Sequence, residues 1–86
     1  MKEQEKILKA LANKRRLQII KYLKNKKEAT VGEIADHLKL SFKSSSKHLL
    51  MLMHTNIVEK EQRSLSAFYS LSSHYPPIIR SIIMNL

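Results

Sequence analysis

The fold is decided by residues 30–54, TVGEIADHLKLSFKSSSKHLLMLMH, which predict two short helices joined by a tight turn. Thr30 with Glu33 three positions later forms a capping box at the start of the first helix. Ser41 is suited to cap the second helix, and the turn falls at Lys39. Two helices joined by a turn of three or four residues predict a helix-turn-helix.

The helix predicted from Phe42 onward is polar in its first half and apolar in its second half. Serine, lysine and histidine dominate residues 42–48, whereas leucine and methionine fill residues 49–53. A helix that is apolar on every side is buried, so we expect Leu50 and Met51 to face the first helix, the last helix or a partner copy. Residues 42–48 suit the DNA major groove, because short hydroxyls and flexible cations reach phosphates and base edges. A solvated amphipathic face is the alternative.

Two residues of the polar half have special requirements. Ser45 lies on the side of the helix that continues toward the core, where its hydroxyl requires a hydrogen-bond partner. Phe42 could touch a thymine methyl group or fold back onto the hairpin that is predicted after this helix. We expect Phe42 to pack rather than to read bases.

Two further helices are predicted before residue 30. Residues 3–12 place apolar side chains on one helical face, and Asn13 is suited to cap the helix that follows. That second helix opens with Lys14, Arg15 and Arg16, whose charges oppose the helix macrodipole by roughly 0.3–1 kcal/mol each. These three cations could be surface charges that the helix tolerates, or they could face an anionic partner, and the sequence favours neither interpretation. The apolar stripes are Ile7, Leu8 and Leu11 in the first helix and Leu17, Ile20 and Leu23 in the second.

A hairpin and a last helix are predicted in the remainder of the chain. Residues 57–62 and 65–71 indicate two strands around a turn at Arg63, and the Pro76-Pro77 pair suits the first turn of a helix. One face of the second strand is predicted to carry Leu65, Ala67, Tyr69 and Leu71. The last helix carries the apolar stripe Ile78, Ile79, Ile82, Ile83 and Leu86.

The order of the elements predicts a mainly α fold with a small β-hairpin, α-α-α-α-β-β-α, which is a winged helix-turn-helix. We expect one domain over residues 1–86, with the helix-turn-helix at about 30–54, the wing at about 57–71 and a C-terminal dimerisation helix at about 76–86. The core of so short a chain is thin, and assembly with a second copy is a common remedy.

The composition points to an anionic partner. Lysine and arginine total 16 against 7 acidic residues, for a formal charge of +9, and such an excess favours nucleic acid. The chain has no cysteine, which excludes disulfides and thiolate metal sites and permits a cytoplasmic protein. No stretch approaches the ~18 apolar residues of a membrane span, so no membrane partner is expected.

Neither catalysis nor metal binding is expected. Ser44 and His48 are four residues apart, the reach of a nucleophile and its base, but no acid is placed to orient the histidine and a glycine-rich oxyanion turn is missing. No two histidines are three or four residues apart, the spacing at which a helix binds zinc. The histidines are His37, His48, His54 and His74. We therefore expect no enzyme, no metal and no cofactor.

Several segments in register resemble one family of regulators. The order and spacing of ALANKRRLQIIKYL, ATVGEIADHLKLS, SSSKHLLML and NIVEKE followed by AFYSL are similar to the ArsR/SmtB family of winged-helix transcriptional repressors, from about residue 6 to residue 71. The resemblance implies a homodimer, built mainly from the first and last helices, that binds an operator. It also implies that operator release is often triggered by a bound metal.

The chain departs from the pattern of that family at the sensing positions. Where arsenic- and lead-sensing members carry two cysteines, this chain has Thr30 and Gly32, so that soft-metal site is not expected. The last helix, from Ile78 on, lacks the acids and histidine of zinc-sensing members. Lys39 stands where the turn glycine is usual, and the wing is poor in basic residues, with Arg63 beside two acids. The inducer stays open.

We predict a homodimeric, sequence-specific DNA-binding transcriptional repressor with a near-palindromic operator, resident in the cytoplasm and associated with the nucleoid. Two alternatives stay open, a winged-helix module for protein interaction or dimerisation and a non-specific architectural DNA binder. The candidate DNA-binding residues are Arg16, Ser41, Phe42, Lys43, Ser44, Ser46, Lys47, His48 and Arg63. The candidate dimer-interface residues are Ile7, Leu8, Leu11, Ile78, Ile79, Ile82, Ile83 and Leu86.

Overall fold

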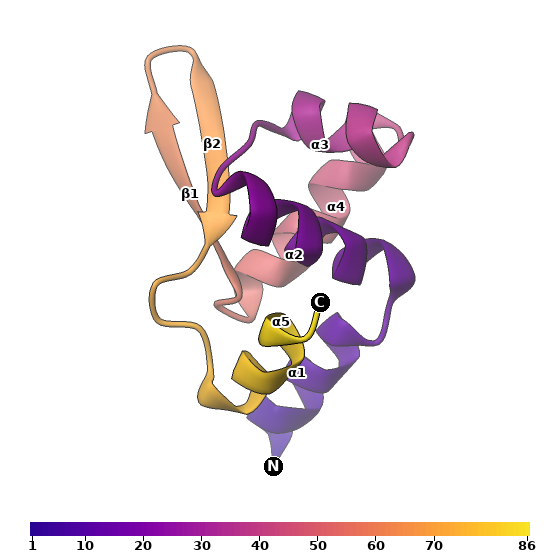
Figure 1. Ribbon diagram of the computed structural model, residues 1–86, viewed down its shortest axis with the longest axis vertical. Helices are drawn as coiled ribbons and strands as arrows, with labels where there is room; N and C mark the ends of the chain where they lie inside the picture. The colour runs from indigo at the N-terminus through magenta and orange to yellow at the C-terminus, as the bar shows by residue number, and fades with distance from the viewer.

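The computed structural model describes residues 1–86 as five α-helices and one two-stranded antiparallel hairpin (Figure 1). The elements are α1 (Lys2–Leu11), α2 (Lys14–Lys26), α3 (Val31–Leu38), α4 (Phe42–His54), β1 (Val58–Arg63), β2 (Ser66–Leu71), the 3-10 turn η1 (Pro77–Ile79) and α5 (Arg80–Met84). This order confirms the predicted winged helix-turn-helix arrangement. The last α-helix is shorter than predicted, because the segment begins with the 3-10 turn Pro77–Ile79 and is α-helical only from Arg80.

Side-chain caps determine where three of the helices begin. The Asn13 side chain accepts a hydrogen bond of 3.0 Å from a backbone N–H of the first turn of α2, and the Ser41 hydroxyl does the same for α4, also at 3.0 Å. At α3 the capping box is complete: the Thr30 hydroxyl accepts from the Glu33 N–H, and the Glu33 carboxylate accepts from the Thr30 N–H. The three predicted caps are confirmed, and each satisfies an N–H that the helix itself leaves unpaired.

The turn between α3 and α4 is left-handed at Lys39, where φ is 57° and ψ is 44°. A residue with a Cβ in this region is disfavoured relative to glycine by roughly 1 kcal/mol. The Leu40 N–H donates to the Ala35 carbonyl oxygen at 3.0 Å, which closes the end of α3. The turn therefore keeps the usual geometry of a glycine turn although it carries a lysine.

The core is a single cluster to which all five helices, the turn η1 and the base of the hairpin contribute. Its fully buried apolar side chains are Ile19, Ile20, Leu23, Ile34, Leu49, Leu52, Ile57 and Ile79. Ser45 of α4 is also fully buried, as predicted, and its hydroxyl has no hydrogen-bond partner. The longest helices, α2 and α4, have 13 residues each, and no helix is both long and apolar enough to pass through a membrane.

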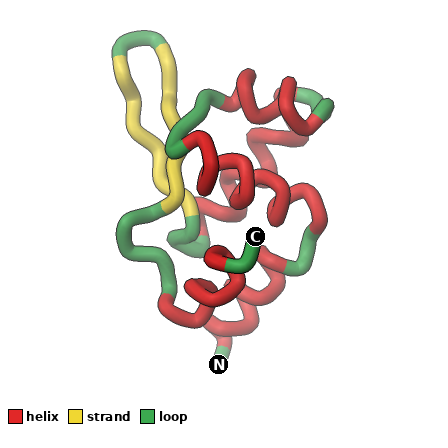
Figure 2. Tube along the Cα trace, in the orientation of Figure 1, coloured by secondary structure: helices red, strands yellow, loops and turns green.

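The hairpin projects from the helical body and ends in a tight turn (Figure 2). Pairing runs from Val58 opposite Leu71 to Arg63 opposite Ser66. Leu65 therefore lies in the turn and is 97% exposed, so the prediction that it shares the packed face of the second strand was wrong. The positive φ of 54° at Ser64 explains the shift, since a tight hairpin turn requires such a residue.

A backbone pairing that the sequence did not reveal connects the hairpin to the loop before α3. The Ala29 N–H donates to the Tyr69 carbonyl oxygen at 3.0 Å, and the Tyr69 N–H donates to the Ala29 carbonyl oxygen at 2.8 Å. These two bonds hold β2 against the helical body. They also place the preceding residue, Glu28, beside the hairpin.

Candidate nucleic-acid interface

The exposed face of α4 changes character along its length. Lys43 and Lys47 are exposed and one helical turn apart, on the side opposite the buried residues of the helix. Neither lysine forms an ion pair in the protomer. We call these two residues the lysine pair. The two charges of the lysine pair have no acidic partner. The position of α4 itself is fixed by its contacts with α2 and α3.

Polar side chains flank the lysine pair. Ser44 and Ser46 are partly buried at its edges, and the Ser41 hydroxyl is already engaged as the cap of α4. Phe42 is 65% exposed, so the prediction that it folds back onto the hairpin was wrong. The hairpin meets α4 through β1 near the end of that helix, and it lies out of reach of the first turn. An exposed phenyl ring is thereby left at the first residue of α4.

The apolar second half of α4 is buried on one side only. Leu49 and Leu52 lie in the core, but Leu50 and Met51 are 51% and 43% exposed. The expectation that an apolar half-helix is buried all round was therefore wrong within the protomer. The cause is that α2, α3 and β1 all pack against the same side of α4.

Arg16 is engaged inside the protomer. Its Nε donates to the Ala10 carbonyl oxygen at 2.6 Å and its Nη2 donates to the Lys9 carbonyl oxygen at 3.0 Å. The guanidinium thus caps the C-terminal end of α1, where a cation is favourable. Three of the five guanidinium N–H donors of Arg16 are thus used within the fold, and its contact with a DNA phosphate stays a prediction.

His48 of α4 lies against the same guanidinium, with 3.3 Å between Arg16 Nη1 and His48 Nδ1. Partial burial lowers the pKa of His48, and the positive charges of Arg16 and Arg15 lower it further. A neutral ring can accept the Arg16 N–H at Nδ1 while carrying its own proton on Nε2. His48 therefore joins α4 to the junction of α1 and α2, and its Nε2 is left as its one donor.

Arg63, the predicted wing contact, is held by two carboxylates. It makes two hydrogen bonds to Glu28, of 2.6 and 2.8 Å, and a third to Glu61 at 2.7 Å. Its guanidinium also lies 4.8 Å from the centroid of the Phe68 ring. Glu28 and then Glu61 raise the pKa of Arg63, and its hydrogen bonds lower the pKa of Glu28. Arg63 is therefore paired within the protomer, and its contact with a DNA phosphate stays a prediction.

Lys60 on β1 is a cation of the wing that the sequence prediction did not include among the candidate contacts. It is exposed and forms no ion pair. The period of two along a strand was the available signal, since it places Lys60 on the face opposite its neighbours Glu59 and Glu61.

The eight predicted interface residues fall into two groups. Ile7, Leu11, Ile79 and Ile83 are buried in the core of the protomer, and their part in a dimer interface stays a prediction. Leu8, Ile78 and Ile82 are 51%, 47% and 37% exposed, and Leu86 is partly exposed. The helix period explains the division, because successive apolar residues in a 1, 3, 1, 3 pattern span both the inner and the outer side of a short helix.

Residues 13–60 match the family described as bacterial regulatory protein, arsR family. The chain is 42% identical over 67 residues to the transcriptional activator HlyU of Vibrio cholerae. That match covers 78% of this chain and 61% of the relative, so the chain spans less than two thirds of the length of HlyU.

Solved structures show the same fold at higher coverage. Reduced HlyU from Vibrio cholerae superimposes with a TM-score of 0.81 and 36% identity, over 98% of this chain and 84% of that one. The transcriptional repressor PagR of Bacillus anthracis superimposes with a TM-score of 0.81 and 26% identity, over 98% of this chain and 92% of that one. The homodimeric winged helix-turn-helix DNA-binding domain of a Mycobacterium bovis protein superimposes with a TM-score of 0.82 and 25% identity, over 98% of this chain and 74% of that one. With its family match covering more than half of its length, the chain belongs to the arsR family of bacterial regulatory proteins.

Proposed function

We propose that the chain is a homodimeric DNA-binding transcriptional repressor that reads a near-palindromic operator through α4. The observation that carries this proposal is the lysine pair: Lys43 and Lys47 stand uncompensated on the exposed face of a capped helix that is second in a helix-turn-helix. Membership of the arsR family supports the assignment. A DNA-bound regulator of this kind would reside on the nucleoid, in the cytoplasm.

The residues of α4 divide the work by chemistry. Lys43 and Lys47 donate to backbone phosphates, and the flanking Ser44 and Ser46 reach base edges. The exposed ring of Phe42 is available to a thymine methyl group. Because no arginine is free on α4 or on the wing, we expect modest sequence discrimination and an affinity dominated by phosphate contacts.

The proposed dimer buries the apolar side chains that α1 and the C-terminal segment leave exposed. The elements α1, η1 and α5, which carry the exposed Leu8, Ile78 and Ile82, lie at the end of the molecule remote from the hairpin turn (Figure 1). A two-fold axis at that end would set the two copies of α4 about one DNA turn apart, roughly 34 Å. The homodimeric state of the Mycobacterium bovis domain supports this arrangement.

The dimer is tested by sedimentation equilibrium. Ile82→Glu should shift the protein to monomer, because it places a charge in the apolar contact. Leu65→Glu is the matched control, since Leu65 is 97% exposed at the tip of the wing. A dimer that withstands Ile82→Glu, or a protein that is monomeric without any substitution, would contradict the proposed interface.

DNA binding and repression are tested separately. Fluorescence anisotropy with a random duplex in about 50 mM salt should show binding, because a basic domain with a free groove helix has non-specific affinity. No binding would favour a protein-interaction module. Footprinting on genomic DNA should find protected sites with two-fold symmetry, whereas uniform protection would favour an architectural binder. A reporter gene downstream of a protected site should be less transcribed when the protein is present, and increased transcription would make it an activator.

A further inference from the structure

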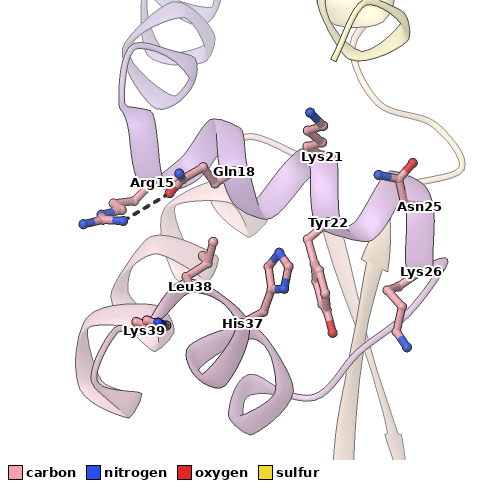
Figure 3. Close-up of a pocket in the computed structure, with 9 residues that line it drawn as sticks. All are labelled: Arg15, Gln18, Lys21, Tyr22, Asn25, Lys26, His37, Leu38 and Lys39. Carbon is pink, nitrogen blue, oxygen red and sulfur yellow. Dashed lines mark hydrogen bonds between the residues drawn. The ribbon is translucent and has the colours of Figure 1, made fainter.

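A basic groove runs between α2 and α3, with a volume of about 850 Å³ (Figure 3). That volume falls within the range of about 300–1,000 Å³ typical of small-molecule sites. Most of the lining side chains are polar, so an apolar ligand is disfavoured. The groove is lined by Arg15, Gln18, Lys21, Tyr22, Asn25, Lys26, His37, Leu38 and Lys39.

The charges of the groove are all of one sign. Four of its side chains are lysine or arginine, none is a carboxylate, and none of the four forms an ion pair elsewhere. Their one side-chain hydrogen bond joins Arg15 to Gln18 at 3.3 Å. Cations gathered without a counter-charge repel one another, and an anion bound among them relieves that repulsion.

An aromatic pair lies in the middle of the groove. The rings of Tyr22, from α2, and His37, from α3, stack with their centroids 4.3 Å apart. Figure 3 shows the two rings in the gap between the helices, with Lys26 toward one end and Arg15 and Lys39 toward the other. The cations therefore lie at both ends, which suits a ligand with more than one anionic group.

The groove is separate from the exposed face of α4. The inner side of α2, at Ile19, Ile20 and Leu23, is buried against the core, on which α4 also packs. The groove residues of α2 lie on another side of that helix, and α2 stands in front of α4 in Figure 1. A duplex lying on the lysine pair of α4 would thus leave the groove to another anion.

We propose that this groove binds a phosphorylated small molecule that carries at least two anionic groups. The phosphates lie between the cations at the two ends of the groove, over the Tyr22–His37 pair. Lys39 also occupies the left-handed turn that leads into α4, so the bound ligand touches the segment that positions that helix. This site is independent of the proposed function, because it needs no DNA.

The test is an NMR titration of the ¹⁵N-labelled full chain with sodium pyrophosphate at constant ionic strength. Amide shifts should concentrate at groove residues such as Gln18, Tyr22 and His37. Lys26→Gln with Lys39→Gln should weaken binding by at least about tenfold, since two charge-assisted contacts to phosphate are removed. The charge-retaining pair Lys26→Arg with Lys39→Arg should keep most of the affinity. Shifts spread over α4, or an equal loss from Lys43→Gln with Lys47→Gln, would overturn the site.

A second measurement separates a free phosphorylated ligand from the phosphates of DNA. The salt dependence of duplex binding should be the same for the unsubstituted protein and for Lys26→Gln with Lys39→Gln. The slope of log K against log salt could instead become as shallow for this variant as for Lys43→Gln with Lys47→Gln. That result would make the groove part of the DNA-binding surface and overturn the proposal. If the unsubstituted protein binds no duplex at all, the proposed function is contradicted, but the pyrophosphate result is unaffected.

Discussion

The guanidinium of Arg63 makes two parallel hydrogen bonds, of 2.6 and 2.8 Å, to the carboxylate of Glu28, which lies 35 positions earlier in the chain. The contact joins the end of β1 to the connection between α2 and α3. It depends on the backbone pairing of Ala29 with Tyr69, which brings Glu28 to the hairpin. The arginine of the wing is therefore neutralised within the protomer, where an operator would otherwise offer it a phosphate.

Glu28→Gln should strengthen DNA binding. The substitution removes a carboxylate that competes with phosphate for Arg63. The slope of log K against log salt should therefore become steeper by about 0.9 for each new phosphate contact in each subunit. Anisotropy titrations of one duplex at several salt concentrations measure the slope. Glu59→Gln makes the same charge change on β1, at a residue that does not contact Arg63. Equal effects of the two substitutions would show that only net charge matters.

Ser45→Ala should stabilise the protein. The Ser45 hydroxyl is fully buried and unpartnered, and such a group costs about 1–3 kcal/mol of desolvation. We expect the free energy of unfolding to rise by roughly 1 kcal/mol beyond the helix-propensity gain of a serine-to-alanine change. Urea denaturation measures it, with Ser46→Ala on the edge of the exposed face of α4 as the propensity control. A Ser45→Ala gain no larger than that of Ser46→Ala would mean that the hydroxyl is satisfied in solution.

Lys39→Gly should also stabilise the protein, by roughly 1 kcal/mol, because glycine adopts the left-handed turn without a Cβ clash. Lys39→Ala keeps the Cβ and should give no such gain. Thermal unfolding of the three proteins decides this point. If the groove is a ligand site, Lys39→Gly should at the same time weaken pyrophosphate binding, which would explain why a lysine is kept at a strained position. Unchanged stability of Lys39→Gly would show that the turn is relaxed.

The stability of the fold should fall as the pH drops below about 6.5, through His48. Burial and the nearby arginines lower the pKa of His48 in the folded protein, whereas the unfolded chain keeps the ordinary value of about 6.5. Between the two pKa values the unfolded state binds more protons than the folded state, so the free energy of unfolding decreases as the pH is lowered. His48→Gln should reduce the decline between about pH 7.5 and 5.5, measured by urea denaturation. His74→Gln, at an exposed loop position, is the control. An identical decline in the two variants would exclude His48 as the cause.

Local chemistry made the helix boundaries predictable. A side-chain cap depends on residues three positions apart, so Asn13, Thr30 and Ser41 could be assigned from the sequence and are confirmed. The left-handed conformation of Lys39 was left open by the sequence, because a lysine stands where the turn glycine is usual. The fold class followed from these boundaries and from the order of the elements.

Contacts between distant residues could not be predicted in this way. Arg16 and Arg63 looked like free cations because their partners, the carbonyl oxygens at the end of α1 and Glu28, are defined only by tertiary packing. Leu50 and Met51 looked buried because periodicity does not say how many sides of a helix are covered. The groove between α2 and α3 was missed for the same reason, since its residues come from two helices whose separation is a property of the fold.

The salt dependence of duplex binding by Lys43→Gln with Lys47→Gln tests the central claim most directly. If the lysine pair contacts phosphates in both subunits, the slope of log K against log salt should become shallower by about 0.9 for each lost contact, or roughly 3–4 for the dimer. Lys2→Gln with Lys6→Gln, an equal charge change on exposed residues of α1, should leave the slope nearly unchanged. A slope that is the same with and without the lysine pair would contradict the placement of α4 against DNA.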